Sequence, residues 1–412
     1  MPLKQVYEIG EQPPFGVVPE LMFAQVVRAA RFGEPRDAIR MEVVPVPPIG
    51  PRDVLVYVMS AGINYNNIWA SLGVPLDVIE FHKRDGDPSD FHIGGTDGAG
   101  IVWAVGSEVT SVRPGQEIVV YPHAWDENDP FVVNGGDPIV APSGRPLGYL
   151  SSWGTFAQFA RLKECQCLPR PQHLTWEESA AYMVSGATAY RMLTGFAEHT
   201  VRENDVVLVW GAAGGVGCMA VQIATMAGAI AVAVVSSEQR GRYCLEQGCR
   251  GYIDRRKFRH WGPLPHWTDT NRYQEWLEGA RQFGNEIWNI VGARRNPRIV
   301  IEHPGEATLP TSLYVCDTSG MVAICGGTSG YHASFDLRHH WTRQKRVQGA
   351  QLGDRREGAK VNELVSARRL DPCVGKTFRF DETALAHQLL RESRDCFGNS
   401  VVRVGCASRE RA

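Results

Sequence analysis

The sequence predicts an α/β protein, in which a β-rich part precedes a parallel sheet covered by helices. Short apolar runs separated by Gly and Pro fill residues 1 to about 170, as is typical of strands and turns. From about Leu174 the pattern becomes helical. An apolar strand, a glycine turn, an apolar helix and a second apolar strand then follow within about 30 residues, which indicates a βαβ unit.

The order of these patterns predicts three segments. Residues 1–172 are expected to form the N-terminal part of a catalytic domain, and residues 173–342 a nucleotide-binding domain. Residues 343–412, of mixed α and β pattern, are expected to return to the first domain.

Individual elements follow from local patterns. Apolar side chains alternate over residues 54–58 and 101–105, which predicts strands. Thr175, with a glutamate three residues later, predicts a capped helix start. Two further strands are expected at 298–301 and 321–325, whereas the Trp-, Arg- and His-rich residues 255–295 predict an irregular or helical insertion.

Composition limits the classes of function. The 412 residues contain 43 Lys and Arg against 45 Asp and Glu, so nothing in the overall charge favours nucleic acid or a membrane surface as a partner. The first residues lack the apolar stretch of a signal peptide, and the longest apolar run, 229–235, is too short to span a bilayer. We therefore expect a cytoplasmic protein whose ten scattered cysteines are reduced thiols.

Residues 210–217 read WGAAGGVG and lie between the predicted strand and helix. A dinucleotide site needs this arrangement, because backbone N–H groups at a helix N-terminus face the pyrophosphate and bulky side chains would block it. The turn therefore predicts a nicotinamide cofactor on Gly211, Ala213, Gly214, Gly215 and Val216. The alternative is a glycine-rich turn that only allows close packing of helix and sheet.

The end of the second strand distinguishes the two nicotinamide cofactors. NAD enzymes usually carry an acidic residue there, which binds the ribose 2′-hydroxyl. Here Ser236 and Ser237 occupy the strand end and Arg240 follows, a set that suits a 2′-phosphate and predicts NADPH. Glu238 leaves the NADH alternative open.

Metal chemistry is not expected. Residues 61–73, where zinc alcohol dehydrogenases carry a ligand cysteine, contain no Cys or His, and no four-cysteine cluster is present. The remaining chemistry for a nicotinamide enzyme is hydride transfer to a polarised acceptor.

From about residue 12 to about 406 the chain resembles the crotonyl-CoA carboxylase/reductases, zinc-free members of the medium-chain dehydrogenase/reductases. The stretches that carry the resemblance are AGINYNNIWASLG, HIGGTDGAGIVWAVG, LPRPQHLTWEESAAYMVSGATAYRML, VVLVWGAAGGVG, VVSSEQRGRYC, IEHPG and CGGTSGYHASFDLRHHW. The resemblance implies a GroES-like β-rich catalytic domain plus a Rossmann domain with a doubly wound parallel sheet. It also implies a homodimer or homotetramer that pairs through edge strands near residues 320 to 340.

The resemblance further implies that NADPH delivers a hydride to the β-carbon of a 2-enoyl-CoA or an enoyl-carrier-protein thioester. The resulting enolate takes up CO2, or a proton in plain reductases, and such products serve polyketide biosynthesis or carbon assimilation. Cys325, Thr328 and Ser329 are then expected near the cofactor, and Asn64 or Asn66 at the reaction centre. Tyr65 and Tyr149 are candidate proton donors.

The chain departs from the carboxylating members at two positions. They carry glutamate after the aromatic residue at Tyr149, where this chain has Leu150, and histidine where it has Gln351. Because CO2 beside an enolate needs positioned donors and exclusion of water, we expect carboxylation to be weakened or lost. The alternatives are a complete reductive carboxylase, a quinone or enone reductase, and a non-catalytic nucleotide-binding protein.

The residues Lys345, Arg346, Arg355 and Arg356 form a basic stretch in the sequence. Two interpretations remain open for it: a site for the phosphates of CoA, or a solvated face.

Overall fold

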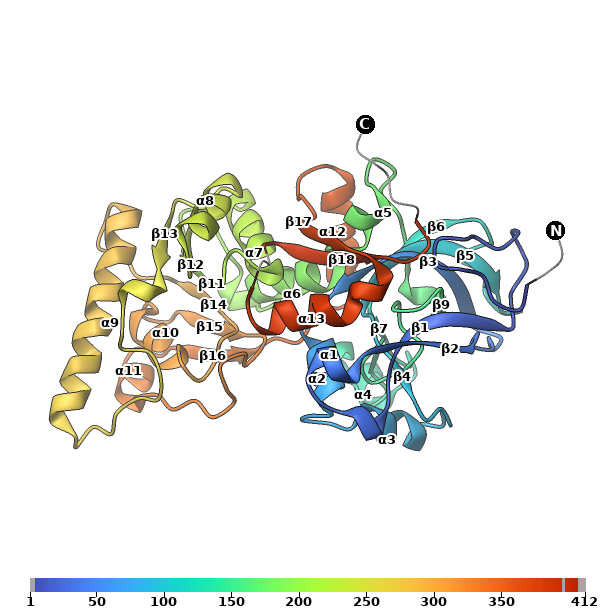
Figure 1. Cartoon of the computed structure of the whole chain (residues 1–412). Coiled ribbons are helices and arrows are strands. Elements are labelled where there is room, and N and C mark those ends of the chain that lie inside the picture. The colour runs from blue at the N-terminus through green and yellow to red at the C-terminus, as the bar shows by residue number, and fades with distance from the viewer. Residues whose placement is uncertain (1–3, 395–396, 407–412) are drawn as a thin grey trace. The chain divides into compact units, whose positions relative to one another are not determined.

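The computed structural model describes residues 4–394 and 397–406. The chain divides into two compact units (Figure 1). The first contains residues 1–184, 354–368 and 372–412, and the second residues 185–353 and 369–371.

The first unit is built on antiparallel strands. Its main sheet has the order β10-β6-β5-β3-β18-β17, with β9 also pairing with β3, and a smaller sheet has the order β2-β1-β4. The strands are β1 (Leu21–Val27), β2 (Arg40–Pro45), β3 (Asp53–Ile63), β4 (His92–Ile93), β5 (Asp97–Val105), β6 (Glu117–Val120), β7 (His123–Ala124), β8 (Arg145–Pro146), β9 (Phe159–Lys163), β10 (Cys167–Pro169), β17 (Val374–Phe378) and β18 (Asn399–Arg403).

Short helices connect these strands, and the last strand returns to the centre of the sheet. The helices are α1 (Pro35–Ala38), α2 (Asn66–Leu72), α3 (Val78–Arg84), α4 (Pro130–Val133), α5 (Trp176–Ser179), α12 (Arg355–Ser366) and α13 (Thr383–Arg391). β18 pairs antiparallel with β3, so the C-terminal strand belongs to the sheet of the first unit. Tyr57, Trp103 and Phe159 pack edge-on or tilted in its core.

The second unit contains a six-stranded parallel sheet of order β13-β12-β11-β14-β15-β16. Its strands are β11 (Val206–Trp210), β12 (Ile230–Val235), β13 (Gly251–Asp254), β14 (Ile299–Glu302), β15 (Met321–Ile324) and β16 (Arg346–Gly349). Its helices are α6 (Met183–Thr194), which begins at the boundary, α7 (Gly215–Met226), α8 (Glu238–Glu246), α9 (Thr270–Val291), α10 (Leu309–Val315) and α11 (Leu337–Trp341).

Helices cover this sheet as a doubly wound fold requires. Phe283 and Ile287 of α9 and Leu313 of α10 share a core with Leu208 and Trp210 of β11. The helices α7 and α8 pack against β11, β12 and β13 and contribute nothing to that core. The expected fold class, a GroES-like β-rich domain plus a Rossmann doubly wound parallel sheet, is confirmed.

Two details differ from the sequence predictions. The expected segment 343–412 begins with β16, which pairs parallel with β15 and belongs to the second unit, so the units divide at Asp354 rather than at residue 343. The other division falls after Val184 rather than after residue 172. The insertion 255–295, predicted to be irregular or helical, contains the 22-residue helix α9, which is amphipathic and buries Trp276, Phe283 and Ile287.

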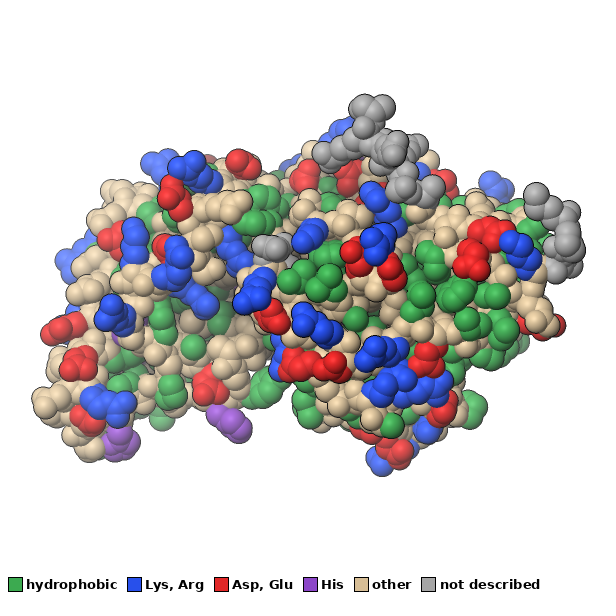
Figure 2. Space-filling model, in the orientation of Figure 1, with side chains coloured by type: hydrophobic (Ala, Val, Ile, Leu, Met, Phe, Trp, Pro, Cys, Tyr) green, Lys and Arg blue, Asp and Glu red, His purple; other side chains and the backbone are tan. Residues whose placement is uncertain are grey.

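Charged side chains of both signs are interspersed on the face shown in Figure 2, in agreement with the formal net charge of −2. Among the described residues, no helix combines the length and the apolarity that crossing a membrane requires.

Candidate active site

The glycine turn connects β11 to α7, and two of its glycines allow close packing. Gly211 has φ +54°, and a Cβ atom there would lie 2.2 Å from Nε2 of His303. A Cβ atom on Gly217 would lie 2.4 Å from the carbonyl oxygen of Gly211. Side chains at these two positions would separate the strand, the turn and the helix.

Gly214 has a different role, because the space above it is open. It is the N-cap of α7 with φ −91°, and a Cβ atom there would meet only the Gly211 carbonyl oxygen, at 3.4 Å. Gly214, Gly215 and Val216 are half-buried, whereas Ala213 beside them is buried. The first-turn N–H groups of α7 have no acceptor within the helix. The residues present therefore fit the pyrophosphate of a dinucleotide.

At the end of β12, Ser237 caps α8 by accepting a hydrogen bond from the backbone N–H of Arg240, at 3.2 Å. Ser236 and Arg240 are half-buried beside it. Glu238, the candidate ribose-binding acid, instead pairs with Arg242 at 2.7 Å, and both side chains are largely exposed. The end of β12 therefore carries the hydroxyl groups of Ser236 and Ser237 and is followed by the guanidinium group of Arg240. The carboxylate of Glu238 is paired with Arg242 on α8.

A second basic group lies at this edge of the sheet and was not predicted from the sequence. β13 pairs parallel with β12, so residues after Asp254 reach the same edge as residues after Val235. Arg256 pairs with Asp254 at 2.6 Å, whereas Arg255 and Lys257 are exposed and form no ion pair with a described carboxylate. Recognising the four-residue strand β13 would have identified them.

The expected cofactor loop, residues 325–330, is fastened to the loop that follows β14. Ser329 donates from Oγ to the Pro304 carbonyl oxygen at 2.7 Å, and Thr328 donates from its backbone N–H to the carbonyl oxygen of His303. Burial raises the pKa of the Cys325 thiol to about 12, so the thiol stays protonated at neutral pH. The side chain of Ser329 is thus used to hold the loop.

In the first unit, the asparagines after β3 form one polar network with the start of β5. Asn64 donates from Nδ2 to Oδ2 of Asp97 at 3.0 Å, and Asn66 donates from Nδ2 to the hydroxyl of Thr96 at 2.7 Å. Asn67 accepts from the backbone N–H of Gly95 at 3.0 Å. Both expected asparagines are half-buried members of this network.

The loop that carries Tyr149 and Leu150 packs against the same segment. A Cβ atom on Gly148 would lie 2.5 Å from the Gly95 carbonyl oxygen, so the two backbones touch. Tyr149 packs beside the apolar cluster of Ala70, Val78 and Ile79. Leu150 is half-buried and offers no polar group there. The first unit therefore brings the asparagines and this loop together around Gly95.

Gln351 lies in the second unit, after β16, and is exposed without a hydrogen bond to a described residue. The predicted basic stretch is not a continuous patch. Lys345 is buried and donates from Nζ to the carbonyl oxygens of Leu313 and Tyr314 at the end of α10, and Arg355 pairs with Glu127 at 2.6 Å.

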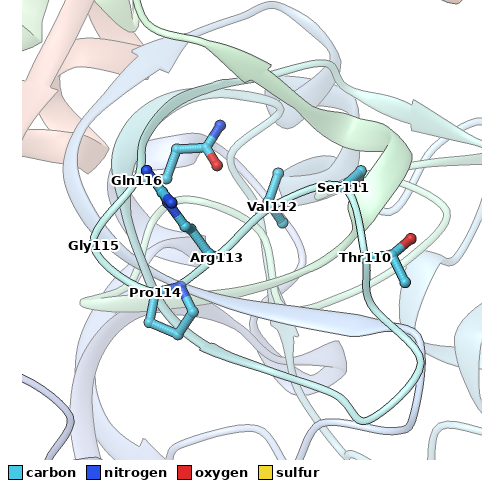
Figure 3. Close-up of a pocket in the computed structure, with 7 residues that line it drawn as sticks. All are labelled: Thr110, Ser111, Val112, Arg113, Pro114, Gly115 and Gln116. Carbon is cyan, nitrogen blue, oxygen red and sulfur yellow. The ribbon is translucent and has the colours of Figure 1, made fainter.

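Two surface hollows lie elsewhere. One is formed by a single loop, residues 110–116, and contains none of the predicted site residues (Figure 3). The other, of about 690 Å³, lies at the N-terminal edge of the parallel sheet and is lined by five arginines together with Trp288 and Asp317. Arg294 and Arg295 follow the C-terminal end of α9, where cations are favoured by the helix dipole.

Among the described residues, no group of three or more His, Cys, Asp or Glu side chains lies close enough to hold a metal ion.

Two family models match the chain: an alcohol dehydrogenase GroES-like domain at residues 50–172 and a zinc-binding dehydrogenase domain at residues 215–367. The chain is 45% identical to a crotonyl-CoA carboxylase/reductase of Cereibacter sphaeroides, over 98% of this chain and 92% of the relative. It is 35% identical to a crotonyl-CoA reductase of Streptomyces collinus, over 86% of this chain and 79% of that protein.

Solved structures give the same result. The crotonyl-CoA carboxylase/reductase AntE in complex with NADP superposes with a TM-score of 0.93 at 50% identity, covering 98% of this chain and 100% of the other. The 2-octenoyl-CoA carboxylase reductase CinF in complex with NADP and 2-octenoyl-CoA superposes with a TM-score of 0.86 at 30% identity, covering 95% and 90%.

Proposed function

The chain belongs to the crotonyl-CoA carboxylase/reductase family, and on that basis we propose that it is an NADPH-dependent reductase of 2-enoyl thioesters. The observation that carries the proposal is the open glycine turn at the start of α7, in a chain that matches NADP complexes over 98% of its length. The thioester is one of CoA, with a carrier-protein thioester as the alternative.

The geometry of the glycine turn and of the end of β12 supports a set of residues that would hold the cofactor. The backbone N–H groups of Gly215 and Val216 bind the pyrophosphate, and Ser236, Ser237 and Arg240 bind the 2′-phosphate. Arg255 and Lys257 add positive charge at the same edge of the sheet. When bound, NADPH supplies a hydride.

The conversion adds the hydride to the β-carbon of the enoyl thioester and leaves an enolate at the α-carbon. A proton from water completes a saturated acyl thioester, and CO2 completes an alkylmalonyl thioester, with NADP⁺ released in both cases. We propose that the proton competes better here, because Leu150 has no hydrogen-bonding group and Gln351 replaces an imidazole.

The second candidate function is complete reductive carboxylation. It is favoured by the identities of 45% and 50% to proteins named as carboxylase/reductases. In that case other groups of the first unit, such as Asn64 and Asn66, suffice to hold CO2.

Product analysis separates these two functions. Purified protein is incubated with NADPH and crotonyl-CoA, with and without saturating bicarbonate, and the acyl-CoA products are identified by mass spectrometry. We expect butyryl-CoA to predominate under both conditions. A product that is mostly ethylmalonyl-CoA would establish the second candidate instead.

The two departing positions are tested in the same assay. The double variant Leu150→Glu with Gln351→His is expected to raise the carboxylated fraction at least tenfold. The control combines the same changes at exposed positions, Leu385→Glu with Gln282→His, and should leave the product ratio unchanged. An equal ratio in all three proteins would show that these positions do not decide the outcome.

A further inference from the structure

Asp97 is a buried carboxylate, and a glycine on the neighbouring strand provides the space for its side chain. It begins β5, is 1% exposed and lies opposite Gly62 of β3. A Cβ atom on Gly62 would lie 2.6 Å from the Cβ atom of Asp97 and 2.6 Å from the carbonyl oxygen of Ala180. Any other residue at position 62 would therefore displace the Asp97 side chain.

The carboxylate has two donors and no cation among the described residues. Oδ2 accepts from Nδ2 of Asn64 at 3.0 Å, and Oδ1 accepts from the backbone N–H of Val184 at 2.8 Å. Val184 lies in the first turn of α6, where backbone N–H groups need an acceptor outside the helix. Asp97 thus joins the end of β3 to the start of α6.

This contact determines which way the Asn64 amide points. An ionised carboxylate only accepts hydrogen bonds, so the amide must turn its nitrogen toward Asp97. One N–H is then used, while the other N–H and Oδ1 remain available. The half-buried Asn64 is thereby held in one of its two possible orientations.

The geometry points to Asp97 as a positioning residue: through its hydrogen bond it fixes the orientation of the Asn64 amide for the reaction. This inference rests on the proposed reductase function and adds a residue to it. Burial raises the pKa of Asp97 to about 7, while the hydrogen bonds from Asn64 and Val184 lower it. Burial and, to a smaller extent, the negative charge of Asp97 raise the pKa of the Tyr182 phenol, so this group stays neutral over the same pH range.

The variant Asp97→Asn tests the inference without changing side-chain volume. If Oδ1 of the new amide accepts from Val184, its Nδ2 faces Asn64, which must then flip and present its own oxygen. We expect kcat to fall at least tenfold, the KM for NADPH to stay within twofold, and the rise of kcat through about pH 7 to disappear. The control Asp53→Asn changes another buried carboxylate of the first unit, which pairs with Lys163, and should keep the parent kcat and pH profile.

The exchange variant Asn64→Asp with Asp97→Asn separates positioning from stability. It restores one donor and one acceptor between the two side chains, so we expect the Tm to recover toward that of the parent protein. Position 64 then lacks an amide, so kcat should remain low. Recovery of kcat in the exchange variant would overturn the inference, as would a parent-like kcat and pH profile in Asp97→Asn.

The orientation of the Asn64 amide can also be followed without turnover, by NMR. The side-chain amide NMR signals of Asn64, assigned through Asn64→Asp, should shift in Asp97→Asn and stay unchanged in Asp53→Asn. Absence of NADPH oxidation by the parent protein would count against the proposed function, whereas unchanged Asn64 signals in Asp97→Asn would count against the role of Asp97.

Discussion

At the scale of single residues, the glycines of the nucleotide turn serve two separate purposes. Gly211 and Gly217 are required by packing, because a Cβ atom at either position would lie within 2.5 Å of other atoms. At Gly214 the fold has space for a side chain. Glycine is needed there only to leave that space for the proposed pyrophosphate. Substitution at Gly214 can therefore remove binding without loss of the fold.

We predict that Gly214→Asp weakens NADPH binding at least 100-fold, or about 2.7 kcal/mol, with little change in Tm. The carboxylate would occupy the site of the pyrophosphate and repel it. Isothermal titration calorimetry measures the affinity and thermal unfolding the stability. Gly217→Asp, in contrast, should lower the Tm, because its side chain has no space.

Arg240 and Arg242 form a matched pair for testing cofactor selection. Both follow the end of β12, but Arg242 pairs with Glu238 on the exposed side of α8. We predict that Arg240→Ala lowers the preference for NADPH over NADH by 10- to 100-fold in kcat/KM, because a charge-assisted contact to the 2′-phosphate is lost. Arg242→Ala should change that preference less than threefold. Equal effects of the two changes would contradict the assignment.

At the scale of elements, the end of β14 is organised by the buried Glu302. Its carboxylate accepts from the backbone N–H of Gly305 at 3.1 Å and from the hydroxyl groups of Thr308 and Ser312. Trp210, the last residue of β11, donates to the same Ser312 at 2.8 Å. These hydrogen bonds hold the loop after β14, whose His303 lies against Gly211 of the glycine turn, to α10. Burial raises the pKa of Glu302 to about 7 despite these donors.

This raised pKa predicts a pH dependence of stability. Between about pH 4.5 and 7 the folded state retains a proton that the unfolded state releases, so this group's contribution to stability falls as pH rises, by up to about 1.4 kcal/mol per unit. Glu302→Gln removes the titration. Urea unfolding of both proteins from pH 5 to 8 should show the variant gaining stability relative to the parent up to about pH 7 and no further. A constant difference would contradict the raised pKa.

The elements also show what the sequence could predict. The unit β11–α7–β12 was predictable because its strands are long apolar runs and its turn is rich in glycine. The strands β13 and β16 are the two edges of the same sheet, and each has only four residues with few buried side chains, so no apolar run marks them. Because β16 was not predicted, the expected end of the second domain, at residue 342, lies before the division at Asp354.

The candidate site was predictable to a similar extent. Asn64 and Asn66 were identified through a family resemblance, and the turn residues through their pattern. Asp97 was not identified, because its partner Asn64 lies 33 positions away in the sequence. The contact joins the end of β3 to the start of β5. A tertiary contact of this kind leaves no local signal in a single sequence.

At the scale of the whole molecule, the second unit has an edge strand that follows a segment with exposed apolar side chains. β16 ends the sheet, and three large apolar residues that precede it in the chain are exposed: Tyr331 at 64%, Leu337 at 59% and Trp341 at 60%. Edge strands with exposed apolar neighbours are typical of subunit interfaces. We therefore propose that the chain forms a homodimer or homotetramer and that this surface is its interface.

We predict that Leu337→Glu with Trp341→Glu lowers the oligomeric mass measured by light scattering, because two charges would be buried at the interface. Trp267→Glu alters an exposed tryptophan of the same unit, 63% exposed, and should leave the mass unchanged. A parent protein that is already monomeric, or a double variant of parental mass, would contradict this use of the edge.

Hydride transfer from NADPH to a conjugated thioester is the central step of the proposed reaction, and isotope labelling tests this step most directly. The protein is incubated with crotonyl-CoA and NADPH that carries deuterium at the transferable C4 position, and the product is analysed by mass spectrometry and NMR. We predict one deuterium on the β-carbon of the acyl chain. A product without deuterium at that carbon, or no consumption of NADPH, would contradict the proposed reaction.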